Sequence, residues 1–240
     1  EISTVPPTLL PHQFSVAAYQ EIFAQRPFAR YILNSFVVAL GSTVLAIATG
    51  SAAAYAISRL RPAFAGPLEA VFLLAALFPP AVLLVPLFSA ARVLQAVDSY
   101  WGLILAHAAL NLPLAVWSLA SFFRGLPREL EDAARIDGFS RLQFYRRILL
   151  PLSAPAVAAA AIIVFIFSWN EFVIALALMQ RDSMRTVPVG IAMLSGTSAY
   201  EVPWGQVSAA IVLTTLPVVA AVLALQRRIL GGLTAGAVKG

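Results

Sequence analysis

Five long apolar stretches, separated by short polar segments, set the pattern of this chain. They cover residues 31–57, 67–91, 100–123, 152–179 and 205–225. About 20 apolar residues in a helix cross the hydrocarbon of a bilayer, so each stretch is long enough to span a membrane. Because lipid offers the backbone no hydrogen-bond partners, the stretches are expected to be helices. The pattern predicts an all-α membrane protein with five spans.

The remaining segments predict surface elements. Residues 1–29 are polar enough to be an external N-terminal segment, with a short surface helix at 15–23, and residues 181–204 form the longest external loop. Pro79-Pro80 and Pro113 lie inside predicted spans and are expected to kink them. Such kinks are compatible either with simple helix packing or with a pathway that changes shape.

Composition supports the membrane interpretation. The chain is 60% hydrophobic and 11% charged, whereas soluble domains carry about 25% charged residues. It has no cysteine and only two histidines, His12 and His107, which lie far apart in sequence. Disulfides and thiolate nucleophiles are excluded, and a metal site has little support. The net charge of +5 does not indicate nucleic-acid binding, because the arginines cluster at span ends.

The distribution of basic residues predicts the orientation. Eleven of the 16 Lys and Arg residues lie at one set of span ends and five at the other. Since cytoplasmic loops carry the excess of basic residues, the first set is expected to be cytoplasmic. The N-terminal segment is then external and the C-terminus cytoplasmic. An external start without a signal-peptide pattern leads us to expect a sixth span upstream.

A charged segment between the third and fourth stretches has its own helix signals. Six arginines and four carboxylates lie between Arg124 and Arg147. Pro127 and the acidic residues after it favour a helix start, Gly138 favours its end, and Ser140 with Gln143 favours a second helix over 141–150. The segment is either a solvated surface hairpin or a place where a soluble partner docks.

The same segment carries a motif that resembles a known family. Asp132-Ala133-Ala134, then Gly138, then Ile148, Leu150 and Pro151 are spaced as in the "EAA" loop of the permease subunits of binding-protein-dependent ABC importers. The family usually has Glu at the position of Asp132, so Glu131 is expected to share that role. The C-terminal tail and the segments Arg30–Ser35 and Trp169-Asn170-Glu171 are similar to the carbohydrate branch, specifically its maltose- and trehalose-type second permease.

The resemblance implies a domain organisation and a set of contact residues. It implies the transmembrane fold of a type I ABC importer over residues 30–228, with an ATPase-coupling loop at 124–151 and a cytoplasmic tail at 229–240. The expected coupling residues are Glu131, Asp132, Ala133, Ala134, Asp137, Gly138, Ile148, Leu150 and Pro151. The tail residues expected to reach the ATPase subunits are Thr234, Ala235, Gly236 and Lys239.

It also implies partners and a location. The expected assembly contains a homologous permease subunit, two ATPase subunits and an extracytoplasmic sugar-binding protein, in a prokaryotic plasma membrane. This chain is expected to be a non-catalytic subunit without a cofactor, since ATP and Mg²⁺ would bind the partner ATPases. A disaccharide or short oligosaccharide is the expected cargo.

A few polar residues inside the fourth stretch and its neighbour are candidates for solute contact. Glu171 is the only carboxylate well inside a predicted span, and a buried charge in a membrane needs a cavity or a partner. Ser168, Trp169 and Asn170 adjoin it, and Asn111 lies in the preceding span. These residues either line the pathway or tie helices together at the subunit interface. His107 is expected to be a satisfied packing residue rather than a ligand.

Two other classes of function remain open. An ion-coupled secondary transporter or channel would need coupling carboxylates or inverted repeats, for which one intramembrane Glu is thin support. A membrane enzyme would need a nucleophile–base pair or a metal constellation, and none appears in the sequence. The chain has no Gly-x-x-x-x-Gly-Lys loop, since its only lysine is Lys239.

Overall fold

The computed structural model describes residues 15–60, 62–194 and 202–237, with side chains through residue 224. These residues form helices joined by short turns, and no β-strand occurs among them. In chain order the elements are α1 (Ala17–Gln25), α2 (Phe28–Tyr55), the π-helical turn η1 (Ala56–Leu60), α3 (Ala65–Leu77), the 3-10 turn η2 (Pro80–Leu83), α4 (Leu84–Val93), α5 (Tyr100–Gly125), α6 (Glu129–Ile136), α7 (Arg141–Phe144), the π-helical turn η3 (Tyr145–Leu149), α8 (Leu150–Leu152), α9 (Ala154–Asn170), α10 (Val173–Leu178), the 3-10 turn η4 (Asp182–Met184), α11 (Val187–Ala192) and α12 (Trp204–Ala237).

The membrane-spanning helices are of two kinds. Within the described residues, three helices are long and apolar enough to cross a membrane unbroken: Phe28–Leu60, Tyr100–Gly125 and Trp204–Ala224. Two further pairs qualify only across a bend, Ala65–Leu77 with Pro80–Val93 at 93° and Arg141–Leu152 with Ala154–Asn170 at 77°. Counting each bent pair as one span gives up to five spans, as the sequence predicts.

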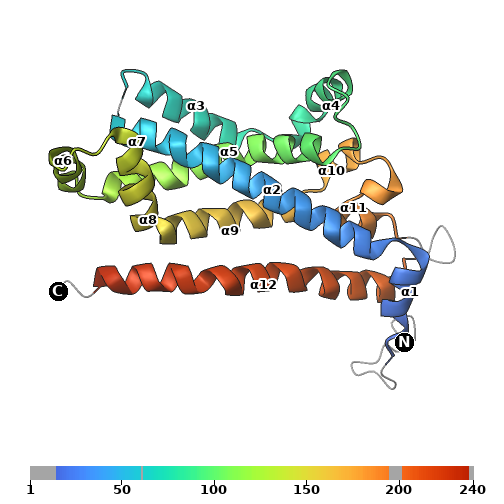
Figure 1. Ribbon diagram of the computed structural model, residues 1–240. Helices are drawn as coiled ribbons and strands as arrows, with labels where there is room; N and C mark the ends of the chain where they lie inside the picture. The colour runs from blue at the N-terminus through green and yellow to red at the C-terminus, as the bar shows by residue number, and fades with distance from the viewer. Residues whose placement is uncertain (1–14, 61, 195–201, 238–240) are drawn as a thin grey trace.

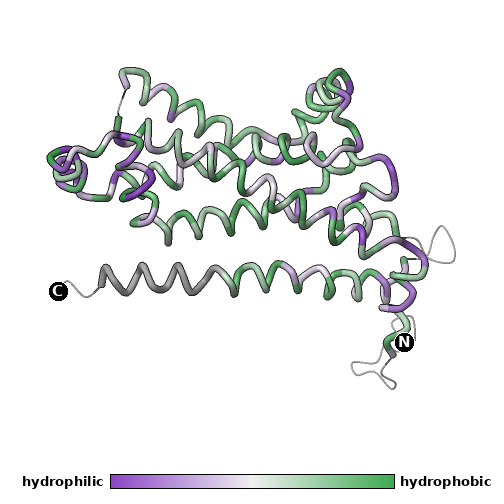
Figure 2. The backbone as a smooth tube through the Cα atoms, in the orientation of Figure 1, coloured by the Kyte–Doolittle hydropathy of each residue, from purple (hydrophilic) through white to green (hydrophobic). Residues whose placement is uncertain are grey.

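The long helices form a bundle with two polar ends. In Figure 1, α2 crosses over α5 and α9, and α12 runs along the far side of α9. Figure 2 shows apolar backbone along the middle of the bundle and polar segments gathered at its two ends. One end carries residues 124–151 and is called here the arginine-rich end. The opposite end carries α1, η4 and α11.

The second predicted span is broken rather than merely kinked. Phe78 and Pro79 each precede a proline and have extended backbones, with ψ of 129° and 120°. The ring of a following proline disfavours the helical conformation in the residue before it, so two prolines in succession impose two extended residues. The result is the 93° turn between α3 and η2–α4. Pro113, by contrast, lies inside α5 without ending it.

The fourth predicted span also differs from the sequence expectation. The sequence predicts one unbroken span over 152–179, directly after Pro151. In the structure, the helical run from Arg141 extends through Leu152 and turns at Ser153. Pro155, not Pro151, occupies the first turn of α9. The helix then ends at Asn170, because Glu171 has an extended backbone, and the separate helix α10 begins at Val173.

The C-terminal helix continues beyond the predicted last span. The backbone of α12 is helical through Ala237, so the predicted tail residues Thr234, Ala235 and Gly236 belong to a helix. The resemblance instead implies a separate tail at 229–240 after the last span. Lys239 lies outside the described residues.

Candidate functional site

The coupling-loop candidates form a helix–turn–helix unit at the arginine-rich end. Glu129, Glu131 and Asp132 lie in the first turn of α6, where carboxylates stabilise the positive end of the helix dipole. Gly138 follows α6 with a φ of 78°, a conformation that glycine adopts without a Cβ clash. The Phe139 N–H donates to the Ala134 carbonyl at 2.9 Å, which closes the turn. The predicted glycine turn is confirmed.

The start of the second helix is also as predicted. The Ser140 Oγ accepts from the Gln143 N–H at 3.3 Å, and the Gln143 Oε1 accepts from the Ser140 N–H at 2.7 Å. This reciprocal capping box fixes α7 directly after the glycine turn. The helical run then continues through η3 and α8 to Leu152.

The two alanines of the motif differ in their exposure. Ala134 is 3% exposed and packs into the protein's own core, in a cluster with Tyr55, Leu119, Phe123 and Phe144. Ala133 is exposed. Both alanines are expected coupling residues, but successive residues of a helix point about 100° apart, so Ala134 packs into the bundle while Ala133 stays exposed.

The outward face of α6 combines Ala133 with Asp132, Asp137 and Ile136, all exposed. The Ile136 side chain is 87% exposed, although it is a large hydrophobic residue. Sequence reasoning did not select Ile136. The sequence did carry a signal for it. Ile136 follows Ala133 by three residues on a predicted helix, and residues at that spacing lie on the same face.

The loop is fastened to the spans by aromatic and polar contacts. The hydroxyls of Ser51 and Tyr145 lie 2.7 Å apart, and the ring of Tyr55 stacks on that of Tyr145 with centroids 5.2 Å apart. An Arg59 guanidinium N–H donates to the Leu126 carbonyl at 2.7 Å. The loop is therefore in direct contact with α2 and η1.

The remaining motif residues belong to the same packing. Ile148 and Leu150 are half-buried, and Ile148 packs against the cluster around Ala134. Pro151 is exposed. Glu131 is half-buried and pairs with Arg135 at 2.8 Å, and Asp132 lies 3.9 Å from the same guanidinium.

A second group of candidates meets inside the bundle, at the break between α9 and α10. The Glu171 Oε2 lies 3.0 Å from His107 Nε2, and His107 Nδ1 lies 2.8 Å from the Ser168 Oγ. The Ser168 Oγ lies 2.7 Å from the Ser42 Oγ. These four residues join α2, α5 and α9. The hydrogen-bond partners of Glu171 therefore lie within this chain, on α5 and at the start of α10.

The other membrane candidates lie outside this network. Asn111 donates to the His107 carbonyl of its own helix at 2.8 Å. Asn170 is exposed, with its amide bonded only to the Ile166 carbonyl at 2.8 Å among the described residues. Trp169 is 3% exposed and stacks on Phe165. Asn170 alone of these presents a polar side chain outward.

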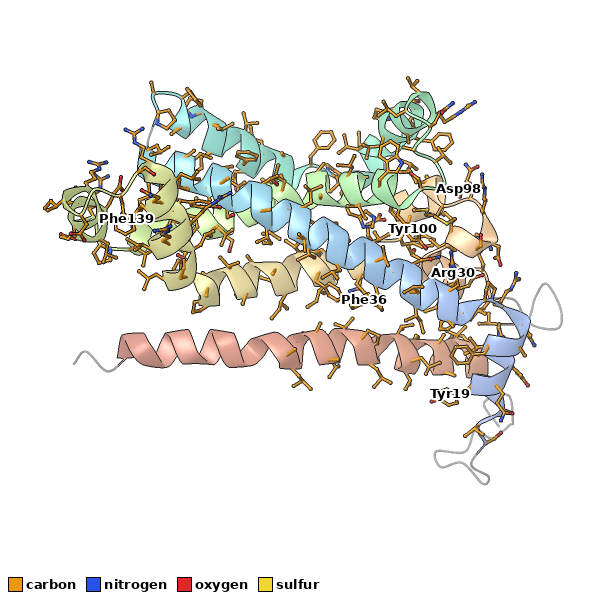
Figure 3. The ribbon with its side chains drawn as sticks, in the orientation of Figure 1. Tyr19, Arg30, Phe36, Asp98, Tyr100 and Phe139 are labelled. Atoms are coloured by element: carbon orange, nitrogen blue, oxygen red, sulfur yellow. The ribbon has the colours of Figure 1, made fainter. Side chains whose placement is uncertain are left out.

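At the end opposite the arginine-rich end, the start of α2 clamps the segment between α10 and α11. The buried Asn34 amide donates to the carbonyls of Ser183 at 3.0 Å and Arg185 at 2.8 Å. The Asn34 Oδ1 accepts from the Tyr100 hydroxyl at 2.6 Å. One side chain therefore holds two helices and the segment around η4. Figure 3 labels Tyr100 in this region.

The same segment is held from two further sides. The Tyr31 hydroxyl donates to Asp182 Oδ1 at 2.8 Å. The Asp98 N–H donates to the Leu178 carbonyl, and Asp98 Oδ1 accepts from the Arg181 N–H, each at 2.8 Å. Sequence reasoning missed Asp98 and Asp182, because nothing local marks a contact over 83 residues, as between Asp98 and Arg181, or over 151, as between Asp182 and Tyr31.

Comparison with known proteins gives a consistent result. Residues 46–233 match the family described as "Binding-protein-dependent transport system inner membrane component". The chain is 39% identical over 240 residues to the sulfoquinovosyl glycerol transport system permease protein SmoH of Agrobacterium fabrum, covering 100% of this chain and 84% of SmoH. It is 40% identical over 232 residues to the trehalose transport system permease protein SugB of Mycobacterium tuberculosis, covering 97% and 85%. The trehalose/maltose transport system permease protein MalG of Thermococcus litoralis is 43% identical over 215 residues, covering 89% and 76%.

Solved structures show the same fold. A chain of a bacterial ABC transporter involved in the import of the acidic polysaccharide alginate superposes with a TM-score of 0.76 at 22% identity, covering 93% of this chain and 84% of that one. A chain of the inward-facing MetNI methionine ABC transporter gives a TM-score of 0.70 at 17% identity, covering 91% and 99%. The fold is thus that of an ABC importer transmembrane subunit, and the sequence match shows that this chain belongs to the family of binding-protein-dependent transport system inner membrane components.

Proposed function

We propose that this protein is one permease subunit of an ATP-driven importer of a disaccharide or short oligosaccharide, in which it forms half of the pathway. The family match supports a transport role. Three relatives at 39–43% identity are named as permeases for trehalose, trehalose/maltose or sulfoquinovosyl glycerol. All three cargoes named contain a sugar, which supports a glycoside as the cargo here.

The outward face of α6 is the observation that carries the coupling role. Ile136 is 87% exposed, with Ala133 beside it, on a helix that packs against α2 and α5 through Ala134. Exposed apolar patches rimmed by polar residues mark sites of protein contact, and Ile136 with Ala133 lies between the exposed carboxylates of Asp132 and Asp137. An ATPase subunit with an apolar cleft lined by basic residues would accept Ile136 and pair with Asp132 and Asp137. This chain itself lacks a phosphate-binding Gly-Lys loop, so ATP and Mg²⁺ would bind such partners.

The broken spans support a pathway within the bundle. Non-helical backbone at membrane depth is tolerated where it is buried in protein or lines a cavity. The two breaks, after Phe78 and at Glu171, pack close together, because α10 contacts both η2 and α4. We assign the solute-facing role to Asn170 rather than Glu171, since Asn170 is exposed and Glu171 is bonded within the chain.

The proposed assembly has a homologous permease subunit, two ATPase subunits and an extracytoplasmic sugar-binding protein, in a prokaryotic plasma membrane with the C-terminus cytoplasmic. A co-purification experiment tests it. The tagged chain, purified from its host membrane, is expected to bring down a P-loop ATPase in the wild type and to lose it in Ile136→Arg. Val93→Arg is the matched control, because Val93 is 84% exposed outside the loop. Equal ATPase recovery in all three would contradict the docking role of α6.

A further inference from the structure

The buried network at the α9–α10 break contains a directional chain of hydrogen bonds. The Ser42 Oγ lies 2.8 Å from the Val38 carbonyl and 3.1 Å from the Ala39 carbonyl of its own helix. A serine hydroxyl has a single hydrogen, and a carbonyl can only accept. Once that hydrogen is directed at the α2 backbone, Ser42 can only accept from Ser168.

The direction passes on to the histidine. If Ser168 gives its hydrogen to Ser42, then the contact of 2.8 Å between Ser168 and His107 must be donated by Nδ1–H. The other ring nitrogen faces the Glu171 carboxyl at 3.0 Å. One hydrogen must lie between Nε2 and Oε2. If it is on Nε2, the pair is an imidazolium and a carboxylate, and if it is on Oε2, both groups are neutral.

The surroundings of Glu171 favour the charged pair. Its Oε1 accepts from the Ile174 N–H at 2.8 Å and its Oε2 from the Ala175 N–H at 2.9 Å, at the start of α10. Backbone donors at a helix start stabilise an ionised carboxylate. The opposite direction of the chain would instead require the Ser42 hydrogen to turn away from the Val38 and Ala39 carbonyls and toward Ser168.

We propose that His107 is an imidazolium, protonated on both ring nitrogens, and that its ion pair with Glu171 positions α10 at the break in the fourth span. In the described part of the chain, Glu171 makes its only ion pair with His107, which is 1% exposed. The far end of α10 is held by the Asp98 N–H on the Leu178 carbonyl. The pair therefore anchors the N-terminal end of α10, while Asp98 holds its C-terminal end.

Histidine-selective ¹⁵N labelling of the purified complex in lipid tests this assignment. The signals that disappear in His107→Gln belong to His107, whichever histidines the partner chains carry. At about pH 8 a histidine in water is neutral, whereas His107 is expected to show two protonated ring nitrogens. A spectrum with either ring nitrogen unprotonated would overturn the imidazolium assignment. The test needs no knowledge of the cargo, so its failure is separable from failure of the proposed function.

A set of substitutions tests the positioning role. Glu171→Gln is expected to convert His107 to a neutral ring with one protonated nitrogen, and to lower sugar uptake. His107→Gln leaves a carboxylate without its cation and is expected to lower the yield of assembled complex. The double variant His107→Gln with Glu171→Gln removes both charges and is expected to recover that yield. A double variant that assembles no better than His107→Gln would contradict a charged pair.

Thr49→Val is the matched control for these variants. Thr49 also lies on α2 and bonds the Leu45 carbonyl of its own helix at 2.7 Å, with no bond to another helix among the described residues. It is expected to leave both the His107 spectrum and uptake unchanged. A shift of the His107 signals in Thr49→Val would show that the spectrum responds to any loss of a polar group, which would remove the support for the pair.

Discussion

Single residues at the arginine-rich end decide whether the loop keeps its shape. Gly138 has a φ of 78° and open space where a Cβ would lie, so a side chain there meets strain rather than a clash. Gly138→Val is expected to destabilise the loop by about 1–2 kcal/mol, the penalty for a left-handed L-residue. Thermal unfolding of the purified complex measures this change.

Two controls separate backbone strain from added bulk at this position. Gly138→Asn is expected to be milder, because asparagine tolerates the left-handed region. Gly125→Ala also adds a Cβ into open space but at a helical glycine, and is expected to be nearly neutral. If valine, asparagine and the Gly125 control behaved alike, φ would not be what selects glycine here.

The motif alanines give a second prediction at this scale. Ala134→Arg places a charge in the cluster with Tyr55 and Phe123, so it is expected to reduce the amount of folded protein. Ala133→Arg is expected to fold normally and to lose ATPase coupling, since Ala133 is exposed. Measuring detergent-stable yield alongside ATP-dependent uptake distinguishes them, and low yield from Ala133→Arg would contradict the assignment of the outer face.

At the scale of elements, local signals predicted more than long-range contacts. The caps at Ser140 and Gly138 act within a few residues, so the α6–turn–α7 unit could be read from spacing. Hydropathy alone placed the five spans but not their breaks. The break at Glu171 depends on its extended backbone and on a carboxylate that bonds the next turn and His107, 64 residues away, and no apolar pattern encodes that.

The clamp formed by Asn34 gives a prediction about the segment between α10 and α11. Asn34→Ala removes three hydrogen bonds from a buried site and is expected to cost about 2–4 kcal/mol. Limited proteolysis should then cut more readily around Ser183 than in the wild type. Gln180→Ala, at an exposed residue of the same segment, serves as control, and equal protection in Asn34→Ala would show that the clamp is redundant.

At the scale of the whole molecule, the C-terminal part of α12 is expected to contact the ATPase pair. Deleting residues 234–240 should leave the spans assembled, because the last apolar stretch of the sequence covers 205–225. The deletion is expected to lower sugar-stimulated ATP hydrolysis without lowering complex yield. If the truncated complex hydrolyses ATP and imports sugar as well as the full chain, then this part of α12 has no coupling role.

The central claim is that this chain couples ATP hydrolysis in its partners to sugar entry through α6. The most direct measurement is uptake of radiolabelled disaccharides into proteoliposomes that contain the complete complex, with the binding protein outside and ATP inside. We expect accumulation that requires ATP, is lost in Ile136→Arg and is retained in Val93→Arg. Accumulation that proceeds without ATP, or that survives Ile136→Arg unchanged, would contradict the claim.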